Sequence, residues 1–250
     1  MASCAHNRPV PPFIAVIPAL NEEQALPRVL GELRSMHPSC IPLVVDDGST
    51  DGTARIAREH GARVVSMPRN VGIGSAVQVG FLVAVREGID LLVQVDADGQ
   101  HDPGQLGTIL GPVMAGDADV VVGSRFLDGG TFDHALHRRF LIRTFAHLIT
   151  LVTGQRLTDT SSSFRAYNRR AIVFCADHYP QGFLESVESL VLLTRAGLTV
   201  QEVPVVIRQR EAGSSSLSLG RTMVYTGKVL LAIAVSLTQS AITPREDVHR

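Results

Sequence analysis

The chain has 250 residues, of which 45% are hydrophobic and 19% charged, and this composition favours a buried core over bulk disorder. The length suits one large α/β domain. A formal net charge of −1, only 5% aromatic residues and no Trp argue against a nucleic-acid-binding protein, so we expect no nucleic-acid partner.

The first half of the chain alternates apolar runs with segments of helical periodicity. Strands are predicted over residues 13–17, 43–45, 62–66, 91–95 and 119–123, and helices over 26–36, 51–60, 74–87 and 103–115. Asn21 is predicted to cap the first helix. Alternating strands and helices are typical of βαβ units, and continuous apolar strands are typical of a parallel sheet that is buried on both faces. We therefore expect an α/β fold with a mostly parallel, Rossmann-like sheet flanked by helices.

The pattern changes after residue 123. A polar loop over 128–137, helices over 138–152 and 185–196, a strand over 199–207, a Gly/Ser-rich loop over 211–218 and a last helix over 222–237 are predicted. There is no internal repeat and no interdomain linker, so a single domain over residues 13–220 with a C-terminal helix and tail over 221–250 is expected.

Polar residues follow four of the predicted strands at the point where each strand ends. These clusters are Asn21-Glu22, Asp46-Asp47, Asp96-Ala97-Asp98 and Ser124-Arg125. In open parallel sheets, ligands bind beyond the carboxyl ends of the strands. The four clusters are therefore expected to converge on one rim and to form a ligand site there.

Asp96 and Asp98 form a D-x-D pattern, and Gln100 follows two residues later. Carboxylate and amide oxygens suit Mg²⁺ or Mn²⁺, which would also bind diphosphate oxygens and stabilise a departing nucleoside diphosphate. An isolated D-x-D is more often an exposed acidic turn. An EF-hand is excluded because His101 and Gly107 occupy positions that require Gly and Glu. The place of the motif after a buried strand favours the cation site.

Asp46 to Asp51 form an acidic run at the end of the second strand. An Asx-turn and a helix start explain Gly48, Ser49 and Asp51, but they do not require two adjacent carboxylates. One of the two, more readily Asp47, is therefore expected to accept hydrogen bonds from a base or from a ribose hydroxyl.

The motifs, taken in order, resemble the family 2 glycosyltransferases with the GT-A fold, and within that family the dolichyl/polyprenyl-phosphate mannose synthase-like enzymes. The resemblance covers roughly residues 13–220 and rests on 18–23, 45–53, 69–72, 96–101, 123–126, 159–160, 163–167, 202–204 and Arg210-x-x-Gly213-x-Ser215. Several such motifs in order are specific, whereas each alone is weak.

The resemblance implies transfer of a hexose, with inversion, from a GDP- or UDP-linked sugar in the presence of Mg²⁺ or Mn²⁺. It implies a nucleoside site at Pro18, Ala19, Asn21, Glu22 and Asp47, a metal and diphosphate site at Asp96, Ala97, Asp98 and Gln100, and phosphate contacts by Arg125, Arg165 and Arg210. Arginine suits this role because its planar guanidinium pairs with phosphate oxygens. The chain departs from the family at Ser163, where Gly is usual, and at Ser216, where Lys is frequent.

Two classes of acceptor remain open. A lipid phosphate is already anionic, whereas a sugar hydroxyl needs a general base, for which Glu185 and Glu188 are the candidates. Relatives that glycosylate hydroxyls commonly have a Glu-Asp pair near this point, but here Ser186 follows Glu185. For Glu188, pairing with an arginine is an equally good interpretation. The missing Asp favours a polyprenyl or dolichyl phosphate, and a glycan or other hydroxyl is the alternative.

The cellular location follows from absences in the sequence. Cys4, Cys40 and Cys175 form no CxxC pattern, residues 1–12 lack the apolar core of a signal peptide, and the apolar run 229–237 is shorter than the roughly 20 residues of a membrane span. A cytoplasmic protein is expected. The basic, amphipathic segment 138–152 either packs on the core or lies on the inner face of a membrane, and 229–237 is a candidate membrane or homodimer contact.

Two other enzyme classes and one binding class compete with this interpretation. A nicotinamide-dependent oxidoreductase needs G-x-G-x-x-G after the first strand, where this chain has Pro18 to Asn21. A sugar nucleotidyltransferase needs a basic, Gly-rich loop there, and this chain has Glu22 and Glu23 instead. A non-catalytic sugar-nucleotide-binding protein is disfavoured because all the expected carboxylates are present.

Overall fold

The computed structural model describes residues 10–127, 150, 154–155, 157–181 and 185–208. The polar loop predicted over 128–137, the helix over 138–152 apart from residue 150, the loop over 211–218 and the last helix lie outside these residues. In the part of the chain that is described, no helix is both long enough and apolar enough to span a membrane.

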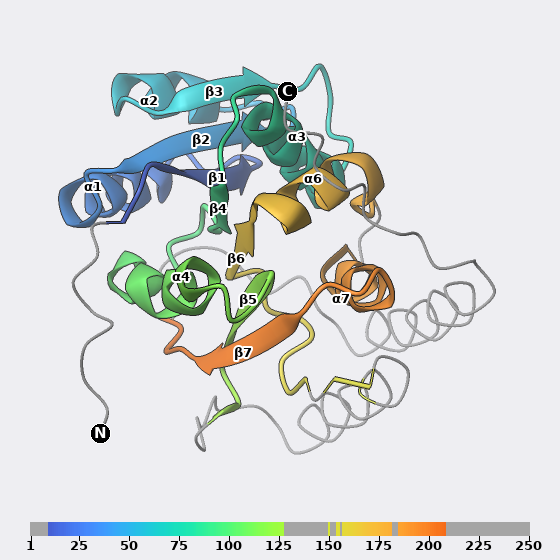
Figure 1. Ribbon diagram of the computed structural model, residues 1–250. Coiled ribbons are helices and arrows are strands. Elements are labelled where there is room, and N and C mark those ends of the chain that lie inside the picture. Colours follow the sequence, from blue (N-terminus) through green and yellow to red (C-terminus); the bar gives the residue numbers. More distant parts are fainter. Residues whose placement is uncertain (1–9, 128–149, 151–153, 156, 182–184, 209–250) are drawn as a thin grey trace, which may run out of the picture.

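A seven-stranded sheet runs through the centre of the molecule (Figure 1). Its strands are β1 (Phe13–Ala19), β2 (Cys40–Asp46), β3 (Arg63–Ser66), β4 (Leu91–Gln94), β5 (Val120–Ser124), β6 (Arg165–Asn168) and β7 (Val200–Pro204). Their order is β3-β2-β1-β4-β6-β5-β7, and only β6 runs antiparallel to its neighbours, β4 and β5. The expected mostly parallel sheet is confirmed.

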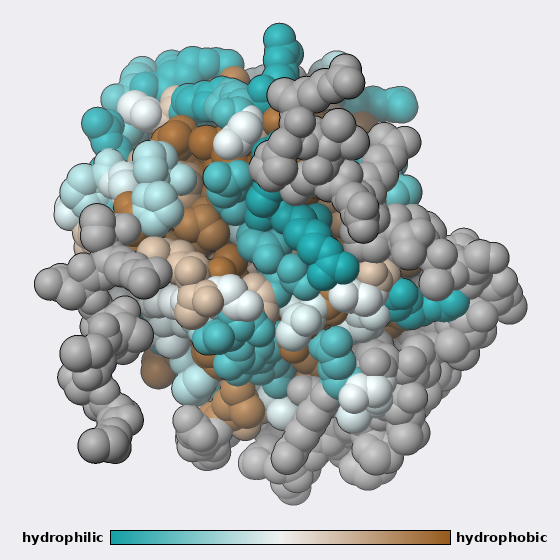
Figure 2. Space-filling model, viewed as in Figure 1, coloured by the Kyte–Doolittle hydropathy of each residue, from teal (hydrophilic) through white to brown (hydrophobic). Residues whose placement is uncertain are grey.

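Helices cover both faces of the sheet. They are α1 (Leu26–Met36), α2 (Thr53–Glu59), α3 (Ile73–Arg86), the 3-10 turn η1 (Pro103–Gln105), α4 (Leu106–Ala115), α6 (Arg169–His178) and α7 (Glu185–Arg195). Hydrophilic residues gather over α2 at the top of the space-filling view (Figure 2). This is expected for the outer surface of a helix whose other side packs on the sheet.

Strand β1 shows why two helical layers are needed. Ile14 and Val16 join the core beneath α3, α6 and α7, whereas Phe13, Ala15 and Ile17 join the core beneath α1 and α4. All five side chains are 0% exposed, since successive residues of a strand point to opposite faces. Each face must therefore be covered by helices, which is the layer arrangement of doubly wound α/β domains.

Two local predictions are corrected by the structure, and two elements were not predicted. Asn21 does not cap α1, because the residue at the N-cap position is Ala25 and Asn21 instead adopts a positive φ of 56°. Strand β7 ends at Pro204 rather than at residue 207, because the chain then crosses to the D-x-D loop, where His101 and Ile207 form an isolated bridge. Strand β6 and helix α6 were not predicted as elements.

The topology brings seven strand ends to one edge. The parallel strands β1 to β5 and β7 end there, and β6 begins there, since Arg165 pairs with Gln94 of β4 and Val122 of β5. The segments that precede β6 and follow β7 therefore join the four expected polar clusters at this edge, which we call the rim. The predicted convergence is confirmed.

Candidate active site

The loops after β1 and β2 are joined by hydrogen bonds between backbone and side chains. The Asn21 Oδ1 accepts from the Thr50 amide at 2.9 Å, and the Asn21 amide donates to Ser49 Oγ at 2.9 Å. The Glu22 amide donates to Thr53 Oγ1 at 2.9 Å. The positive φ of Asn21 turns the chain so that these bonds form. The two loops thus make one rigid end of the rim, beside Pro18 and Ala19.

Asp47 positions a third loop at this end of the rim. Its carboxylate is 4% exposed and accepts from the Val71 amide at 2.8 Å and from the Gly72 amide at 2.9 Å. Gly48, with φ +76°, lets the loop come close, because a Cβ there would lie 2.5 Å from the Arg69 carbonyl carbon. The structure shows Asp47 holding backbone, and its contact with a nucleoside stays a prediction.

The D-x-D loop leaves β4 with Asp96 directed to the rim. Ser163 donates its hydroxyl to Asp96 Oδ2 at 2.7 Å, while Asp96 Oδ1 is buried and has no hydrogen-bond partner among the described residues. Asp98 Oδ1 accepts from the Gln100 amide at 3.0 Å, and Gln100 Nε2 donates to the Arg208 carbonyl at 3.4 Å. The loop is therefore held by its own backbone and by the chain that follows β7.

Arg208 links the D-x-D loop to α1. Its Nη1 donates to Glu32 at 2.6 Å and its Nη2 to Asp102 at 2.7 Å, and its own amide donates to the Gln100 carbonyl at 2.9 Å. From α1, Arg28 donates to the Gly99 carbonyl at 3.2 Å. These contacts brace the outer side of the loop.

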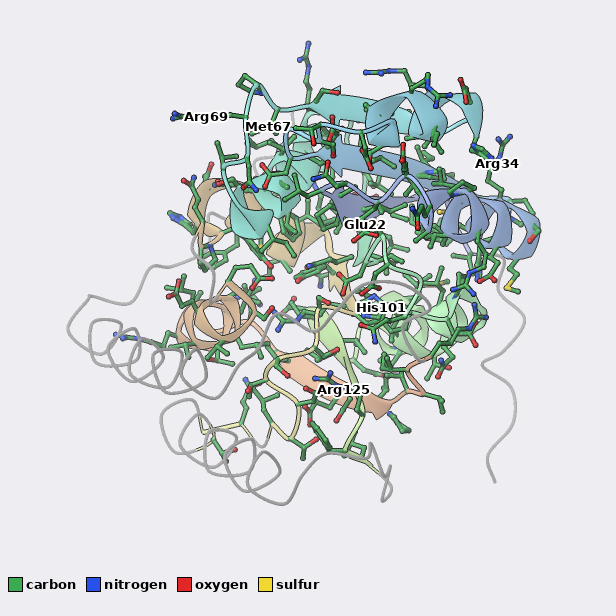
Figure 3. The ribbon with its side chains drawn as sticks, turned by 180° about the vertical axis from the view of Figure 1, so that it is seen from behind. Glu22, Arg34, Met67, Arg69, His101 and Arg125 are labelled. Atoms are coloured by element: carbon green, nitrogen blue, oxygen red, sulfur yellow. The ribbon has the colours of Figure 1, made fainter. Side chains whose placement is uncertain are left out.

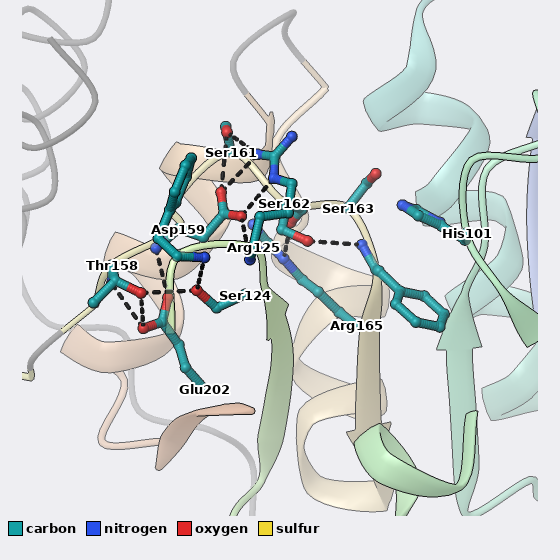
Figure 4. A network of polar contacts seen from close by, with 12 residues as sticks. His101, Ser124, Arg125, Thr158, Asp159, Ser161, Ser162, Ser163, Arg165 and Glu202 are labelled. Atoms are coloured by element: carbon teal, nitrogen blue, oxygen red, sulfur yellow. Dashed lines mark hydrogen bonds and ion pairs between the residues drawn. The ribbon is translucent and has the colours of Figure 1, made fainter. Parts of the chain in front are cut away.

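A network of ionic and hydroxyl contacts lies at the β5 end of the rim (Figure 4). Arg125 donates from Nε and Nη2 to the two oxygens of Asp159, at 2.6 and 2.7 Å, and from Nη2 to Ser161 at 2.6 Å. Burial alone would lower the pKa of Arg125, but these bonds and the charge of Asp159 raise it. Arg125 is therefore a fixed cation, and its Nη1 makes no hydrogen bond within the described residues.

Glu202 on β7 anchors the same network from below. It accepts from the Thr158 amide and hydroxyl and from the Asp159 amide, at 2.7 to 2.8 Å. Burial raises its pKa, and the three donors oppose that shift. Because the anchor fixes the backbone at 158–159, it also fixes the carboxylate that holds Arg125.

Arg165 does not reach the rim surface. Its side chain is 0% exposed and donates to the Ser162 carbonyl at 2.7 Å, the Ser189 hydroxyl at 2.8 Å and the Ser186 carbonyl at 2.7 Å. The structure therefore gives Arg165 the role of joining the start of β6 to α7. Its expected contact with a phosphate stays a prediction that this buried position does not favour.

Glu185 and Glu188 differ in their surroundings. Glu185 is 3% exposed, and its carboxylate accepts from the backbone amide and hydroxyl of Ser186. Burial raises its pKa, Ser186 and Arg165 lower it, and the charge of Asp96 raises it again. Glu188 is half-buried, and burial raises its pKa as well. Arg210 lies outside the described residues.

The rim therefore brings together most of the predicted residues. Glu22, His101 and Arg125 follow one another down the middle of the view from behind (Figure 3). Within the described residues, no three His, Cys, Asp or Glu side chains cluster as an all-protein metal cage. Mg²⁺ is typically bound by one or two carboxylates plus substrate phosphates, so this chemistry suits Asp96, Asp98 and Gln100. The partnerless Oδ1 of Asp96 fits that set.

Several residues of the site had no role predicted from sequence. They are His101, Ser163, Asp159, Glu202 and Arg208. Asp159 and Glu202 stand in motifs that carry the family resemblance, which is the signal that marks them. Arg208 has no such signal, because its partners are 176 and 106 residues away in the chain.

Comparisons with known proteins agree with this geometry. A family model described as glycosyl transferase family 2 matches residues 14–174. The polyprenol monophosphomannose synthase of Mycolicibacterium smegmatis is 32% identical over 84% of this chain and 83% of its own. The undecaprenyl-phosphate mannosyltransferase of Micrococcus luteus is 36% identical over 83% of this chain and 88% of its own.

Solved structures share the fold at lower identity. Glucosyl-3-phosphoglycerate synthase from Mycobacterium tuberculosis, in complex with Mn²⁺ and UDP-glucose, aligns with a TM-score of 0.66 at 20% identity and covers 90% of this chain and 78% of that one. At this identity the likeness concerns the fold alone, and that fold is GT-A.

Proposed function

Because this chain belongs to the family 2 glycosyltransferases, we propose that it transfers a hexose from a nucleoside-diphosphate sugar to a polyprenyl phosphate with inversion. The observation that carries the proposal is the rim itself, where the D-x-D carboxylates and a fixed arginine lie along the same edge of the sheet. Two relatives that are named for prenyl-phosphate mannosyl transfer support the same acceptor class.

The donor would lie along the rim with its base towards β1 and β2. The joined loops at Asn21 and Asp47 provide a rigid edge for the base and ribose, and they lead directly to the D-x-D loop. Asp96, Asp98 and Gln100 would hold Mg²⁺ or Mn²⁺ and the diphosphate. The Mn²⁺ and UDP-glucose named for the structural neighbour support a metal-dependent donor site in this fold. The base stays open between guanine and uracil.

Sugar transfer with inversion requires a nucleophile to attack one face of the sugar carbon while the diphosphate leaves from the other. The cation, when bound, would stabilise the charge on the leaving diphosphate. Arg125 lies at the other end of the rim, and its charge interacts with that of Asp96. Its Nη1 is suited to a phosphate of the acceptor or of the donor. Holding the reactants in line is itself a large part of such catalysis.

The surroundings of Glu185 favour a phosphate acceptor over a hydroxyl. A general base must reach the proton of the incoming hydroxyl, but the Glu185 carboxylate is 3% exposed and is engaged by Ser186. A phosphate needs no base because it is already ionised at neutral pH. Glu188 is the better placed candidate if the acceptor is a hydroxyl, which is the alternative function.

A lipid acceptor also requires the protein to meet a membrane surface. We propose peripheral association through the basic, amphipathic segment 138–152, which lies almost wholly outside the described residues. Sedimentation with anionic liposomes at low salt tests this. If the protein does not co-sediment, membrane association is contradicted, but the proposed donor site is not affected by that result.

The decisive experiment supplies the full chain with sugar nucleotides and a polyprenyl phosphate. A panel of GDP- and UDP-sugars is first screened with Mn²⁺ for thermal stabilisation, since a ligand at one hundred times its Kd adds about 2.7 kcal/mol. The donor that stabilises is then incubated with the lipid phosphate, and nucleoside diphosphate and glycolipid are measured. The matching polyprenol, which lacks the phosphate, is the control acceptor.

Release of nucleoside diphosphate with polyprenyl phosphate but not with polyprenol supports the proposal. Equal turnover with a hydroxyl acceptor would replace it with the alternative. Pyrophosphate release from a nucleoside triphosphate and a sugar phosphate would instead identify a nucleotidyltransferase.

A further inference from the structure

The two oxygens of the Asp96 carboxylate have different surroundings. Oδ2 accepts from the Ser163 hydroxyl at 2.7 Å and lies 3.6 Å from His101 Nε2. Oδ1 is buried and has no hydrogen-bond partner among the described residues. One oxygen is thus occupied by the protein and the other is left for a ligand. Figure 4 shows Ser163 and the imidazole of His101 beside each other.

His101 is itself held in place. Its Nδ1 accepts from the Asp96 amide at 3.0 Å, so in the neutral ring the proton is on Nε2, which faces Oδ2. The ring stacks on Phe164 with centroids 4.6 Å apart and is 5% exposed. Residues 163 and 164 therefore act together, one on the carboxylate and the other on the imidazole behind it.

We infer that Ser163, supported by His101, confines Asp96 to binding a cation through one oxygen and thereby tunes the site for Mg²⁺ and Mn²⁺ against Ca²⁺. This inference rests on the proposed function, because it presumes that Asp96 binds the cation. Mg²⁺ requires near-ideal octahedral geometry, whereas Ca²⁺ takes six to eight oxygens and accepts carboxylates through both. Because the Ser163 hydroxyl donates to Oδ2, it opposes binding of a cation through both oxygens of the Asp96 carboxylate.

Ser163 is a positioning residue in this account, since it acts on the cation through Asp96. Partners of this kind orient metal ligands, and their loss typically lowers metal affinity 10- to 100-fold. The serine stands where Gly is usual in the family that the sequence resembles. A glycine has no hydroxyl to offer Asp96, so a change of Ser163 to Gly removes this contact.

The test measures Mn²⁺ binding to the full chain by electron paramagnetic resonance, with GDP or UDP present, and then its competition by Mg²⁺ and by Ca²⁺. The variants are Ser163→Ala and Ser163→Gly. Ser75→Ala is the matched control, since Ser75 is also partly buried but its hydroxyl donates to the backbone carbonyl of Val71, just before α3, and not to a carboxylate. Thermal melting confirms that each variant is folded.

We expect both Ser163 variants to bind Mn²⁺ about 10-fold more weakly and Ca²⁺ nearly as well as before, so that the preference for Mn²⁺ over Ca²⁺ narrows by about the same factor. Ser75→Ala should leave the preference for Mn²⁺ over Ca²⁺ unchanged. If the unaltered protein binds Mn²⁺ and the Ser163 variants keep its preference, the inference fails while the proposed function stands. If the unaltered protein binds no Mn²⁺ with either nucleotide, the proposed metal site itself fails.

Discussion

The two ends of the rim are built by different physical means. At the β1–β2 end, the loops are joined mainly by backbone amides that donate to side-chain oxygens, as between Asn21 and Ser49–Thr50. At the β5–β7 end, Glu202 accepts from the Asp159 amide, and the Asp159 carboxylate, which is 0% exposed, forms an ion pair with Arg125. In the first arrangement the donors are uncharged backbone amides, even where the acceptor is the buried Asp47 carboxylate. In the second, two oppositely charged side chains pair with each other.

This difference determines how much a single substitution at each end lowers the free energy of unfolding. A backbone amide near the surface that loses its partner can hydrogen-bond to water instead, so the free energy of unfolding falls only modestly. A buried charge that loses its partner has no such replacement, and breaking such a pair typically costs 3–5 kcal/mol. The β5–β7 end should therefore be stiff but vulnerable, and the β1–β2 end tolerant of single changes.

The largest effect is expected for Asp159→Ala. The change leaves the guanidinium of Arg125, whose side chain is 21% exposed, without its carboxylate, and it frees the 158–161 segment. We expect the free energy of unfolding to fall by about 3–5 kcal/mol in urea titrations. Arg55→Ala is the control, because its pair with Glu59 has side chains 65% and 53% exposed and should cost under about 0.5 kcal/mol.

A double variant, Arg125→Met with Asp159→Ala, sharpens this prediction. Removing both charges should restore part of the lost stability, since no unpaired cation remains. A double variant as unstable as the sum of the single changes would contradict the view that the buried pair dominates this end.

The next largest effect, on catalysis rather than stability, is expected for Asp98→Ala. Loss of one electrostatic contact to the leaving group typically lowers kcat about 10²–10³-fold, and Mn²⁺-dependent donor binding should weaken. Steady-state kinetics and thermal shift measurements check both. Asp98 belongs to neither of the two sets of contacts at the ends of the rim, so we expect the Asp98→Ala variant to fold and to unfold cooperatively. Unchanged turnover would remove the metal role assigned to the D-x-D motif.

The sequence predicted one end of the rim better than the other, for a physical reason. Asn21, Asp47 and Asp96 each follow an apolar strand directly, so strand-end reasoning alone places them on one edge. The carboxyl ends of parallel strands meet at one edge of the sheet, so locating the strands in the sequence is enough to place the residues that follow them. The parallel strands β1 to β5 followed from the same pattern, whereas β6 in the middle of the sheet did not.

At the β5–β7 end, the same reasoning placed Ser124 and Arg125 on the rim but could not predict the partners of Arg125. The contacts at this end join residues 34 to 44 positions apart, as between Arg125 and Asp159 or Thr158 and Glu202, and no local periodicity encodes them. Strand β6 is only four residues long and includes the buried Arg165, so it lacks the apolar run that marks a strand. Arg165 was expected near phosphates because a sequence cannot show which arginines are buried.

A moderate effect is expected for Asp47→Asn at the β1–β2 end. The amide nitrogen of Asn is a donor, so one of the bonds from Val71 and Gly72 must be lost. We expect the free energy of unfolding to fall by about 1–3 kcal/mol, with weaker donor binding. Asp51→Asn, an exposed carboxylate in the same loop, should cost less. A larger loss at Asp47 than at Asp159 would reverse the comparison of the two ends.

The smallest effect concerns the pH dependence of stability at Glu185. Burial raises its pKa in the folded protein above the ordinary value of 4.5, so the folded state binds a proton more readily than the unfolded chain. The stability that this proton contributes is present in full below pH 4.5 and is lost as the pH rises through the raised pKa. Gln cannot ionise, so Glu185→Gln should remove this loss.

Urea titrations of the two proteins at several pH values from 4.5 upward measure that difference. The curves should be nearest to each other at acidic pH and should separate towards neutrality, where Glu185→Gln becomes the more stable protein. If turnover with a lipid phosphate also survives the substitution, the carboxylate is not a general base. Equal pH dependence in both proteins would mean that Glu185 is better solvated, and closer to the rim surface, than its 3% exposure indicates.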